Sequence, residues 1–103
     1  MTSIEWSEPA ANDLRRLIDY VRNQHSLNIA SRRLEQIARA VDQLLVWPHY
    51  GHPVSYLDLR VLYVRHAKCR VYYAIRRGGS IVIVRLEAEM ELQKFTEDDQ
   101  KAA

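Results

Sequence analysis

Apolar residues recur at helical spacing through most of the first half of the chain. Ser7, Glu8 and Pro9 form a helix start: a hydroxyl can cap free N–H groups, an anion suits the positive helix end, and proline is tolerated in the first turn. The residues that follow at steps of three and four are Leu14, Leu17, Ile18 and Val21, and the polar positions between them are Asp13, Arg15, Arg16, Asp19 and Arg22. We therefore predict an amphipathic helix from about Glu8, with this polar set facing solvent.

A second helical series follows after a short polar stretch at about residues 23–28. Its apolar members are Leu34, Ile37, Val41, Leu44 and Leu45. Proline cannot continue a helix, so Pro48 predicts an end just after Trp47. Two helices joined by so short a loop pack antiparallel, and the first half of the chain is therefore predicted to be a helical hairpin.

Alternating patterns typical of strands make up the rest of the chain. Residues 48–53, rich in Pro, Gly and His, are predicted to be a turn-rich connection, and the pair Gly78 and Gly79 offers a tight hairpin turn because glycine accepts a positive φ. The strands are expected at about residues 2–6, 57–64, 69–76 and 80–87.

These elements predict an α+β fold in which the helical hairpin packs on a small, mostly antiparallel four-stranded sheet, in the order β-α-α-β-β-β. A chain of 103 residues fits one domain, which we place at residues 1–95, with a frayed segment at 96–103. No apolar run approaches the ~20 residues that cross a bilayer, and Met1 to Glu8 lack signal-peptide features. We therefore expect a cytoplasmic protein with no membrane partner.

The faces of the last two strands differ in character. If Cys69, Val71, Tyr73 and Ile75 face the helices, then Cys69 is a small buried hydrophobe, and the opposite face carries Arg70, Tyr72, Ala74 and Arg76. In the last strand Ile81 and Ile83 share a phase with Arg85, and Val82, Val84 and Leu86 share the other. Such a strand fits the centre of a sheet, or a face that a partner covers.

Basic residues are concentrated in one third of the sequence, although the net charge is only +2. Before residue 60 the chain has six Arg or Lys and seven Asp or Glu, and after Leu86 it has two and six. Between Leu59 and Leu86 there is no acidic residue, and the seven basic residues there are Arg60, Arg65, Lys68, Arg70, Arg76, Arg77 and Arg85. This pattern predicts an unneutralised basic face for nucleic-acid phosphates or an acidic protein segment, unless the arginines only protect a strand edge.

Residues that could carry chemistry are few. His49 and His52 do not predict a metal site, because zinc needs more protein ligands than these two supply. A set of His66, Arg70, Tyr72 and Tyr73 could perform acid–base chemistry on RNA; alternatively, Tyr73 is a core residue, Tyr72 a surface aromatic and His66 a turn residue. There is no glycine-rich phosphate loop, nucleophile motif or zinc-finger spacing. We predict no cofactor and no metal.

The order of these motifs resembles the RelE/ParE superfamily of bacterial toxins from type II toxin–antitoxin pairs, over about residues 3–87. The fold that the resemblance implies, an antiparallel-rich sheet packed on a helical hairpin, coincides with the one predicted from periodicity. The residues that carry it are Trp6 and Ser7 before Ala11, Asp13 and Leu14; Pro48 and Gly51 after the second helix; and Arg60 followed by Arg70, Tyr73 and Ile75.

Within this superfamily the chain resembles the ParE branch more than the ribonuclease branch. The ribosome-dependent ribonucleases use paired lysines, an arginine, and a second arginine and a tyrosine after the last strand. Here only Arg70 matches: the lysine positions fall at residues 61–64, the segment at 87–91 carries three glutamates, and Phe95 stands near the tyrosine position. Carboxylates there would repel a phosphodiester. The similarity to ParE implies a non-enzymatic toxin that poisons DNA gyrase by protein contact.

The resemblance implies a small acidic antitoxin as the cognate partner, with DNA contacted only through that antitoxin. Alternatives are a RelE-like ribosome-dependent mRNA endoribonuclease using Arg70 with Tyr72 or His66, and a non-toxic antitoxin-binding module in an autorepressing complex. For the target we expect contacts from Arg65, Lys68 and Arg77. For the antitoxin we expect contacts from Arg60, Arg70, Tyr72, Arg76, Ile81, Ile83 and Arg85.

Overall fold

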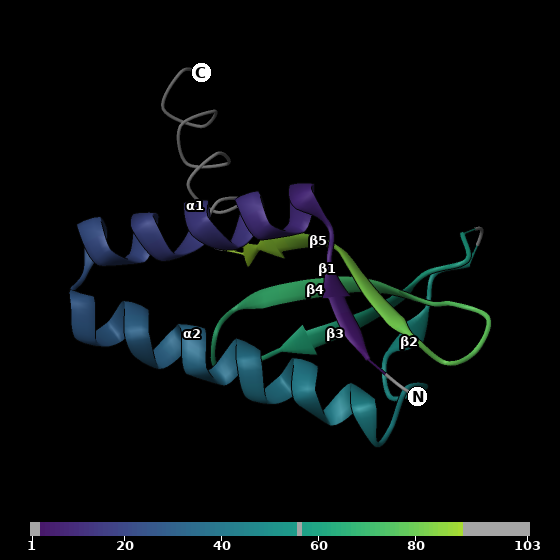
Figure 1. Cartoon of the computed structure of the whole chain (residues 1–103). Helices are drawn as coiled ribbons and strands as arrows, with labels where there is room; N and C mark the ends of the chain where they lie inside the picture. Colours follow the sequence, from purple (N-terminus) through teal and green to yellow (C-terminus); the bar gives the residue numbers. More distant parts are fainter. Residues whose placement is uncertain (1–2, 56, 90–103) are drawn as a thin grey trace.

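The computed structural model describes residues 3–55 and 57–89, and its elements follow the predicted order (Figure 1). The frayed segment expected at 96–103 lies outside the described residues. The helical segments are α1 (Glu8–Gln24), α2 (Leu27–Asp42) and the short 3₁₀ helix η1 (Gln43–Leu45). The strands are β1 (Ile4–Trp6), β2 (His52–Pro53), β3 (Arg60–Val64), β4 (Cys69–Ile75) and β5 (Ile81–Ala88).

The sheet confirms the predicted α+β class but has a fifth strand in the described part of the chain. Its strand order is β1-β5-β4-β3-β2, with β1 parallel to β5 and the other neighbours antiparallel. The added strand, β2, lies within the segment predicted to be a turn-rich connection. Two residues are too few to produce an alternating pattern, so the sequence carried no signal for it. None of the helices in the described ranges is long and apolar enough to cross a membrane.

The start of α1 is where the sequence predicted it and is tied to the sheet. The Ser7 Oγ accepts a hydrogen bond from the Ala10 N–H at 3.2 Å and donates one to the Val84 carbonyl at 3.0 Å. The Ser7 N–H also donates to the Ile83 carbonyl at 3.0 Å. The cap therefore fixes the entry of α1 against β5, which α1 then packs over.

The second helix differs from the prediction at its end and in its packed face. Ser26 caps α2 through the Ile29 N–H, and α2 ends at Asp42 rather than Trp47, because the last turn tightens into η1. Leu34 and Leu45, two members of the apolar series, are 41% and 42% exposed. The apolar series is wider than the buried stripe, which consists of Ala30, Ile37, Val41 and Leu44.

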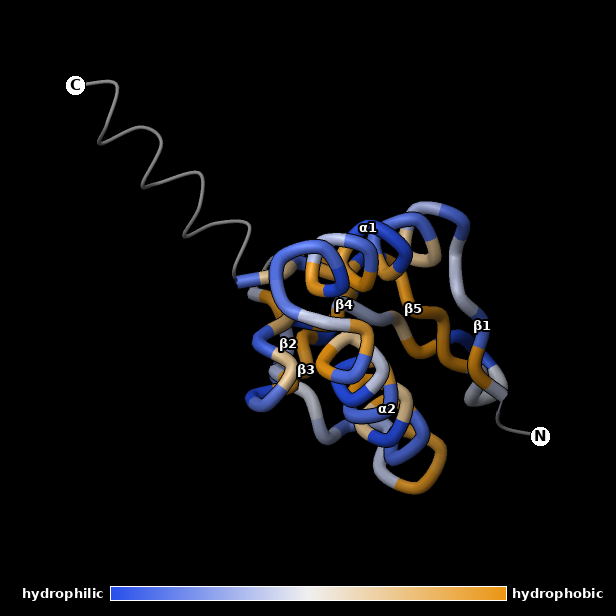
Figure 2. The backbone as a smooth tube through the Cα atoms, turned by 90° about the vertical axis from the view of Figure 1, so that its left-hand side faces the viewer, coloured by the Kyte–Doolittle hydropathy of each residue, from blue (hydrophilic) through white to orange (hydrophobic). Residues whose placement is uncertain are grey.

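The core lies between the helices and one face of the sheet, and the apolar residues of β5 are plain in Figure 2. As predicted, Cys69, Val71 and Tyr73 point inward and are fully buried. Burial raises the pKa of the Cys69 thiol to about 12, as expected for a small core residue rather than a nucleophile.

A buried tyrosine hydroxyl fixes the connection between the helices and β3. The Tyr73 hydroxyl accepts a hydrogen bond from the Gly51 N–H at 2.9 Å and donates one to the Pro48 carbonyl at 2.7 Å. A Cβ on Gly51 would lie 2.7 Å from this hydroxyl oxygen and 2.8 Å from the Val61 carbonyl oxygen. Only glycine fits here, since the clash involves a fixed ring and backbone.

A bulge in β5 changes which of its residues face the core. Tyr72 pairs with Arg85 whereas Tyr73 pairs with Ile83, so Val84 is an extra residue in the ladder. Before the bulge Ile81 and Ile83 are buried, and after it Leu86 and Ala88 are buried. The single alternating phase predicted for this strand is therefore wrong beyond Ile83.

Candidate functional site

The outward side chains of the three central strands form a surface that the helices do not cover, which we call the open sheet face. The cross-strand pairs place Tyr72 between Val61 and Arg85, and Arg70 between Tyr63 and Glu87. All its members are partly or fully exposed, in contrast to the buried row that alternates with them. They are Val61, Tyr63, Arg70, Tyr72, Ala74, Val82, Val84, Arg85 and Glu87.

Three arginines of the basic run have acidic partners, so the prediction of an unneutralised face is wrong. The acids come from β1, from α1 and from the second half of β5, all outside the stretch that lacks them in sequence. The resulting ion pairs are Arg70–Glu87 at 3.0 Å, Arg76–Glu5 at 3.0 Å and Arg85–Asp13 at 2.7 Å. The open sheet face therefore presents apolar groups among paired charges rather than a field of one sign.

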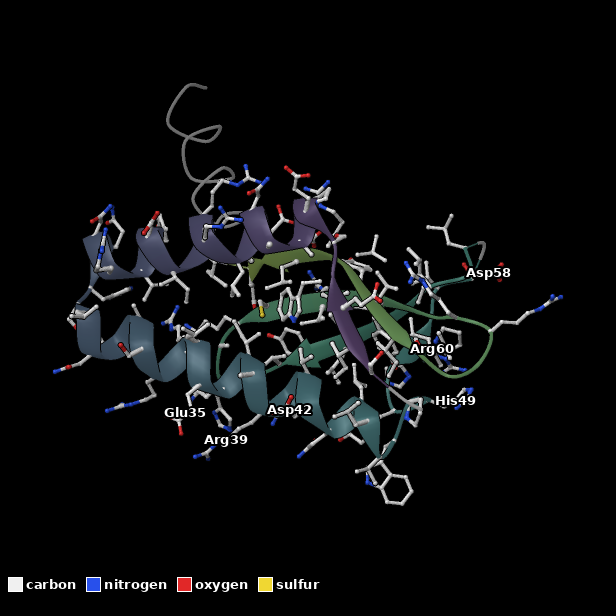
Figure 3. All side chains as sticks on the ribbon, in the orientation of Figure 1. Glu35, Arg39, Asp42, His49, Asp58 and Arg60 are labelled. Carbon is white, nitrogen blue, oxygen red and sulfur yellow. The ribbon has the colours of Figure 1, made fainter. Side chains whose placement is uncertain are left out.

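Arg60 holds a loop. Its NH1 donates to the Gly51 carbonyl at 2.7 Å and to the His49 carbonyl at 3.2 Å, and Figure 3 labels both Arg60 and His49 where the loop meets the strand. Together with the Tyr73 hydroxyl it fixes the segment after α2. Its guanidinium is engaged with backbone carbonyls, so its predicted antitoxin contact would compete with this structural role.

The carboxylate of Asp13 joins α1 to the rim of the open sheet face. It accepts hydrogen bonds from Arg85 Nε at 2.7 Å, Arg85 NH2 at 3.1 Å, Arg16 NH2 at 2.7 Å and the Leu86 N–H at 3.0 Å. Burial by itself raises the pKa of Asp13, but the hydrogen bonds from Arg85, Leu86 and Arg16 outweigh it and hold the pKa below its ordinary value. Asp13 is therefore ionised, and its carboxylate holds the guanidinium groups of Arg16 and Arg85 in position.

Asp13 was predicted to face solvent, and this prediction is wrong because Asp13 is only 7% exposed. The signal that could have found it is its spacing. Ala10, Asp13, Leu17 and Val21 stand three, four and four residues apart and are the buried residues of α1. An acid in the middle of such a row needs partners that pair with its charge and satisfy its hydrogen bonds.

The residues considered for ribonuclease chemistry do not form a catalytic set. Arg70 and Tyr72 share the open sheet face, but Arg70 is paired with Glu87 and lies 5.9 Å from the centre of the Tyr63 ring. His66 is exposed in the turn between β3 and β4, and no hydrogen bond in the described part of the chain joins it to Arg70 or Tyr72.

The three residues predicted to contact a target are not brought together. Arg65 and Lys68 lie in the turn that precedes β4, and Arg77 lies in the turn that follows it. A strand of seven residues separates the two turns by roughly 23 Å at the usual rise per residue. Lys68 has a φ of 53°, a left-handed conformation that is rare for a residue with a side chain.

Some of the residues predicted to contact an antitoxin lie on the surface, and others lie in the core. Arg70, Tyr72 and Arg85 belong to the open sheet face, and Arg76 is exposed beside it. Ile81 and Ile83 are fully buried in the core, so the prediction that their side chains form part of an interface is wrong for the folded chain. Their apolar character reflects packing against the helices.

No set of three or more His, Cys, Asp or Glu within residues 3–55 and 57–89 is arranged to hold a metal ion. The open sheet face is a surface of mixed polarity, shaped by the β5 bulge and by the buried Asp13. Such a surface suits contact with another macromolecule.

Comparison with known proteins finds one matching family model. The family model described as the ParE toxin of the type II toxin–antitoxin system parDE matches residues 4–92. A comparison with curated protein sequences finds no match.

Solved structures with the same fold include chains of two toxin–antitoxin systems and the protein YafQ. A chain of the chromosomal ParDE system from P. aeruginosa superposes with a TM-score of 0.75 at 22% identity, covering 85% of this chain and 96% of that one. A chain of the intact E. coli RelBE toxin–antitoxin complex gives 0.59 at 16% identity, with 82% and 93% covered. YafQ from E. coli strain BL21(DE3) gives 0.58 at 14% identity, with 89% and 98% covered. At these identities the structures establish the fold.

Proposed function

Because this chain belongs to the ParE toxin family of type II toxin–antitoxin systems, we propose that it inhibits DNA gyrase by binding, and that a cognate antitoxin neutralises it by covering the open sheet face. The observation that carries the antitoxin part is the composition of that face. Its centre is apolar, with Val61, Ala74, Val82 and Val84 partly exposed in neighbouring strands. A small protein seldom leaves such a face uncovered.

The ion pairs around the face suit an acidic partner. Each arginine in them contributes some of its five N–H donors to its own partner and keeps the others for a second acceptor. Arg70 and Arg85 are the two such residues on the face, with side chains 42% and 57% exposed. A disordered antitoxin segment could fold here, burying its own apolar side chains and placing its acids on these donors.

Two carboxylates argue for binding rather than RNA cleavage. Glu87 is paired with Arg70, and Glu89 accepts a hydrogen bond of 2.6 Å from the Tyr63 hydroxyl. That hydrogen bond raises the pKa of Tyr63 above its ordinary value, so the phenol stays protonated. A phosphodiester approaching Arg70 would meet negative charge, and a tyrosine that keeps its proton does not act as a base.

The test is gyrase activity with the purified chain. We expect it to inhibit supercoiling of relaxed plasmid by gyrase, and expect the antitoxin encoded with it to restore supercoiling. Val82→Glu, which places a charge in the apolar centre of the open sheet face, should abolish rescue by the antitoxin. Arg22→Glu, on the far end of α1, should leave rescue unchanged.

Ribosome-dependent cleavage of mRNA by the same preparation, with gyrase unaffected, would overturn this proposal in favour of the endoribonuclease. Soluble protein that binds the antitoxin but affects neither gyrase nor translation would instead identify a non-toxic antitoxin-binding module.

A further inference from the structure

A notch opens between α1 and the edge of the open sheet face. It encloses about 380 Å³, within the range of small-ligand sites. Leu59, Tyr72 and Leu86 supply its apolar lining, and Arg16 and Arg85 line it from α1 and β5. A single apolar side chain of a partner could enter it.

Positive charge exceeds negative charge among Asp13, Arg16 and Arg85, because one carboxylate is paired with two guanidinium groups. Asp13, whose side chain is only 5% exposed, bonds both Arg16 and Arg85, while those side chains remain 67% and 57% exposed. The trio carries a net charge of +1. Arg85 uses two N–H groups on Asp13 and Arg16 uses one, so most of the ten donors of the pair remain for another acceptor.

The two arginines are held in place before any partner arrives. Asp13 is anchored to the backbone of β5 through the Leu86 N–H at 3.0 Å, and it lies in the buried row of α1. Little side-chain entropy therefore remains to be lost when a further anion binds Arg85.

We propose that this notch is an anchor site for an acidic residue of the antitoxin that stands beside an apolar one. The apolar side chain would enter between Leu59, Tyr72 and Leu86, and the carboxylate would bind the free N–H groups of Arg16 and Arg85. This inference rests on the proposed function and adds to it the chemistry of one contact.

A protein carboxylate fits the notch better than a nucleic acid does. Glu87 also lines the notch, and its partner Arg70 lies further along the face. A lone carboxylate can sit at the Arg16 side, away from Glu87, and its two oxygens match a guanidinium. A nucleic acid carries a negative charge on every successive phosphate, about one per 3.4 Å of duplex axis for each strand, so a strand bound at Arg16 and Arg85 would also bring phosphates close to Glu87 or Asp13.

The experiment measures the affinity of the purified chain for the purified antitoxin encoded with it, by isothermal titration calorimetry. We expect Arg16→Glu to raise the Kd by about tenfold to a hundredfold, as for charge pairs at protein interfaces. Arg22→Glu is the matched control, because Arg22 is also an α1 arginine paired with an Asp three residues earlier, but it lies outside the notch. We expect this control to stay within twofold of the unsubstituted chain.

Two further variants keep the result interpretable. Arg16→Gln removes the charge without adding a repulsive one, and Asp13 keeps Arg85 and the Leu86 N–H in this variant, so the fold should be retained. Replacing each antitoxin Asp or Glu by its amide in turn should identify one acid whose loss raises the Kd in the native chain but not in Arg16→Gln. Tyr72→Ala should weaken binding by removing one wall of the notch.

The outcomes separate the two proposals. If the unsubstituted chain does not bind the antitoxin, the proposed function fails. If it binds and Arg16→Glu behaves like Arg22→Glu, the notch is not an anchor although the proposed function stands. If the chain binds a 20-nucleotide single-stranded DNA, and Arg16→Glu abolishes this while sparing the antitoxin, the notch recognises phosphates and the inference is overturned.

Discussion

Replacing Asp13 by asparagine should destabilise the fold more than any other single change of charge on α1. The amide has the shape of the carboxylate but only one acceptor oxygen, and its NH₂ group must face an N–H donor. The carboxylate accepts four hydrogen bonds, three from guanidinium groups and one from the Leu86 backbone. Arg16 NH2 and Arg85 NH2 share Oδ1, and Arg85 Nε and the Leu86 N–H share Oδ2, so the amide leaves two donors without an acceptor in either orientation.

The size of the loss in the free energy of unfolding depends on which donors can bond to water once the carboxylate is gone. Arg16 and Arg85 are more than half exposed, so water replaces part of what they lose. When the NH₂ group takes the Oδ2 position, the Leu86 N–H, which is in a buried hydrogen bond, loses its acceptor, and an unsatisfied buried donor costs about 1–3 kcal/mol. With the lost ionic hydrogen bonds, the total is about 3 kcal/mol, at the lower end for breaking a buried ion pair. For a domain of this size that lowers Tm by about 12 °C or more.

Urea unfolding followed by circular dichroism measures this difference, and Asp19→Asn is the matched control. Asp19 is an α1 aspartate paired with Arg22 at 3.5 Å, but its side chain is 63% exposed. Its replacement should cost less than about 0.5 kcal/mol. If Asp13→Asn proved as mild as Asp19→Asn, the structural role of the Asp13 carboxylate would be refuted.

The pH dependence is a second check on the same prediction. The folded pKa of Asp13 is lowered, so its ionised form stabilises the fold fully above the unfolded value of about 3.9, and this contribution is lost as the pH falls through the folded pKa. The free-energy gap between the native chain and Asp13→Asn should therefore be constant from about pH 5 to 7 and narrow below about pH 4. A gap that widened in acid would contradict the assignment.

Three further predictions concern other parts of the fold. Tyr73→Phe removes a buried hydroxyl with two backbone partners and should cost about 1–3 kcal/mol in urea unfolding, whereas Tyr72→Phe should stay within about 0.5 kcal/mol. Lys68→Gly relieves a left-handed φ and should raise the free energy of unfolding by up to about 1 kcal/mol; a decrease would show that the Lys68 side chain contributes contacts of its own. Cys69, with a pKa of about 12, should not react with Ellman's reagent at pH 8 until urea unfolds the chain, and rapid reaction of the native protein would place the thiol at the surface.

The elements that the sequence predicted correctly are those that local chemistry determines. The Ser7 cap, the amphipathic period of α1 and the inward row of β4 each depend on residues within a few positions of one another. The end of α2 was placed too late. Pro48 shows only that the helix cannot continue past Trp47, and the α-helix can end at any residue before that limit. The two-residue β2 and the β5 bulge depend on pairing with other strands, which no local pattern encodes.

The charge of the candidate site was misjudged for a related reason. A count along the chain places Arg85 far from any acid, yet Asp13, 72 positions earlier, is its partner. The correct part of the site prediction was the outward placement of Arg70 and Tyr72, which follows from strand alternation alone. Ile81 and Ile83 show the opposite case, because an apolar residue gives the same signal for a core as for an interface.

The parallel pairing of β1 with β5 sets the order in which the sheet can be completed. Residues 4–6 pair with residues 81–83, so during synthesis β1 has no neighbour until the rest of the sheet has been made. The helical hairpin and the β3–β4 pair involve only nearby residues and can form earlier. Until β5 arrives, Ser7 lacks its partners on Ile83 and Val84, and Asp13 lacks Arg85 and Leu86. The open sheet face therefore comes into existence only as the last strand docks, and a nascent chain that has reached the end of β4 has no complete surface to present to any target.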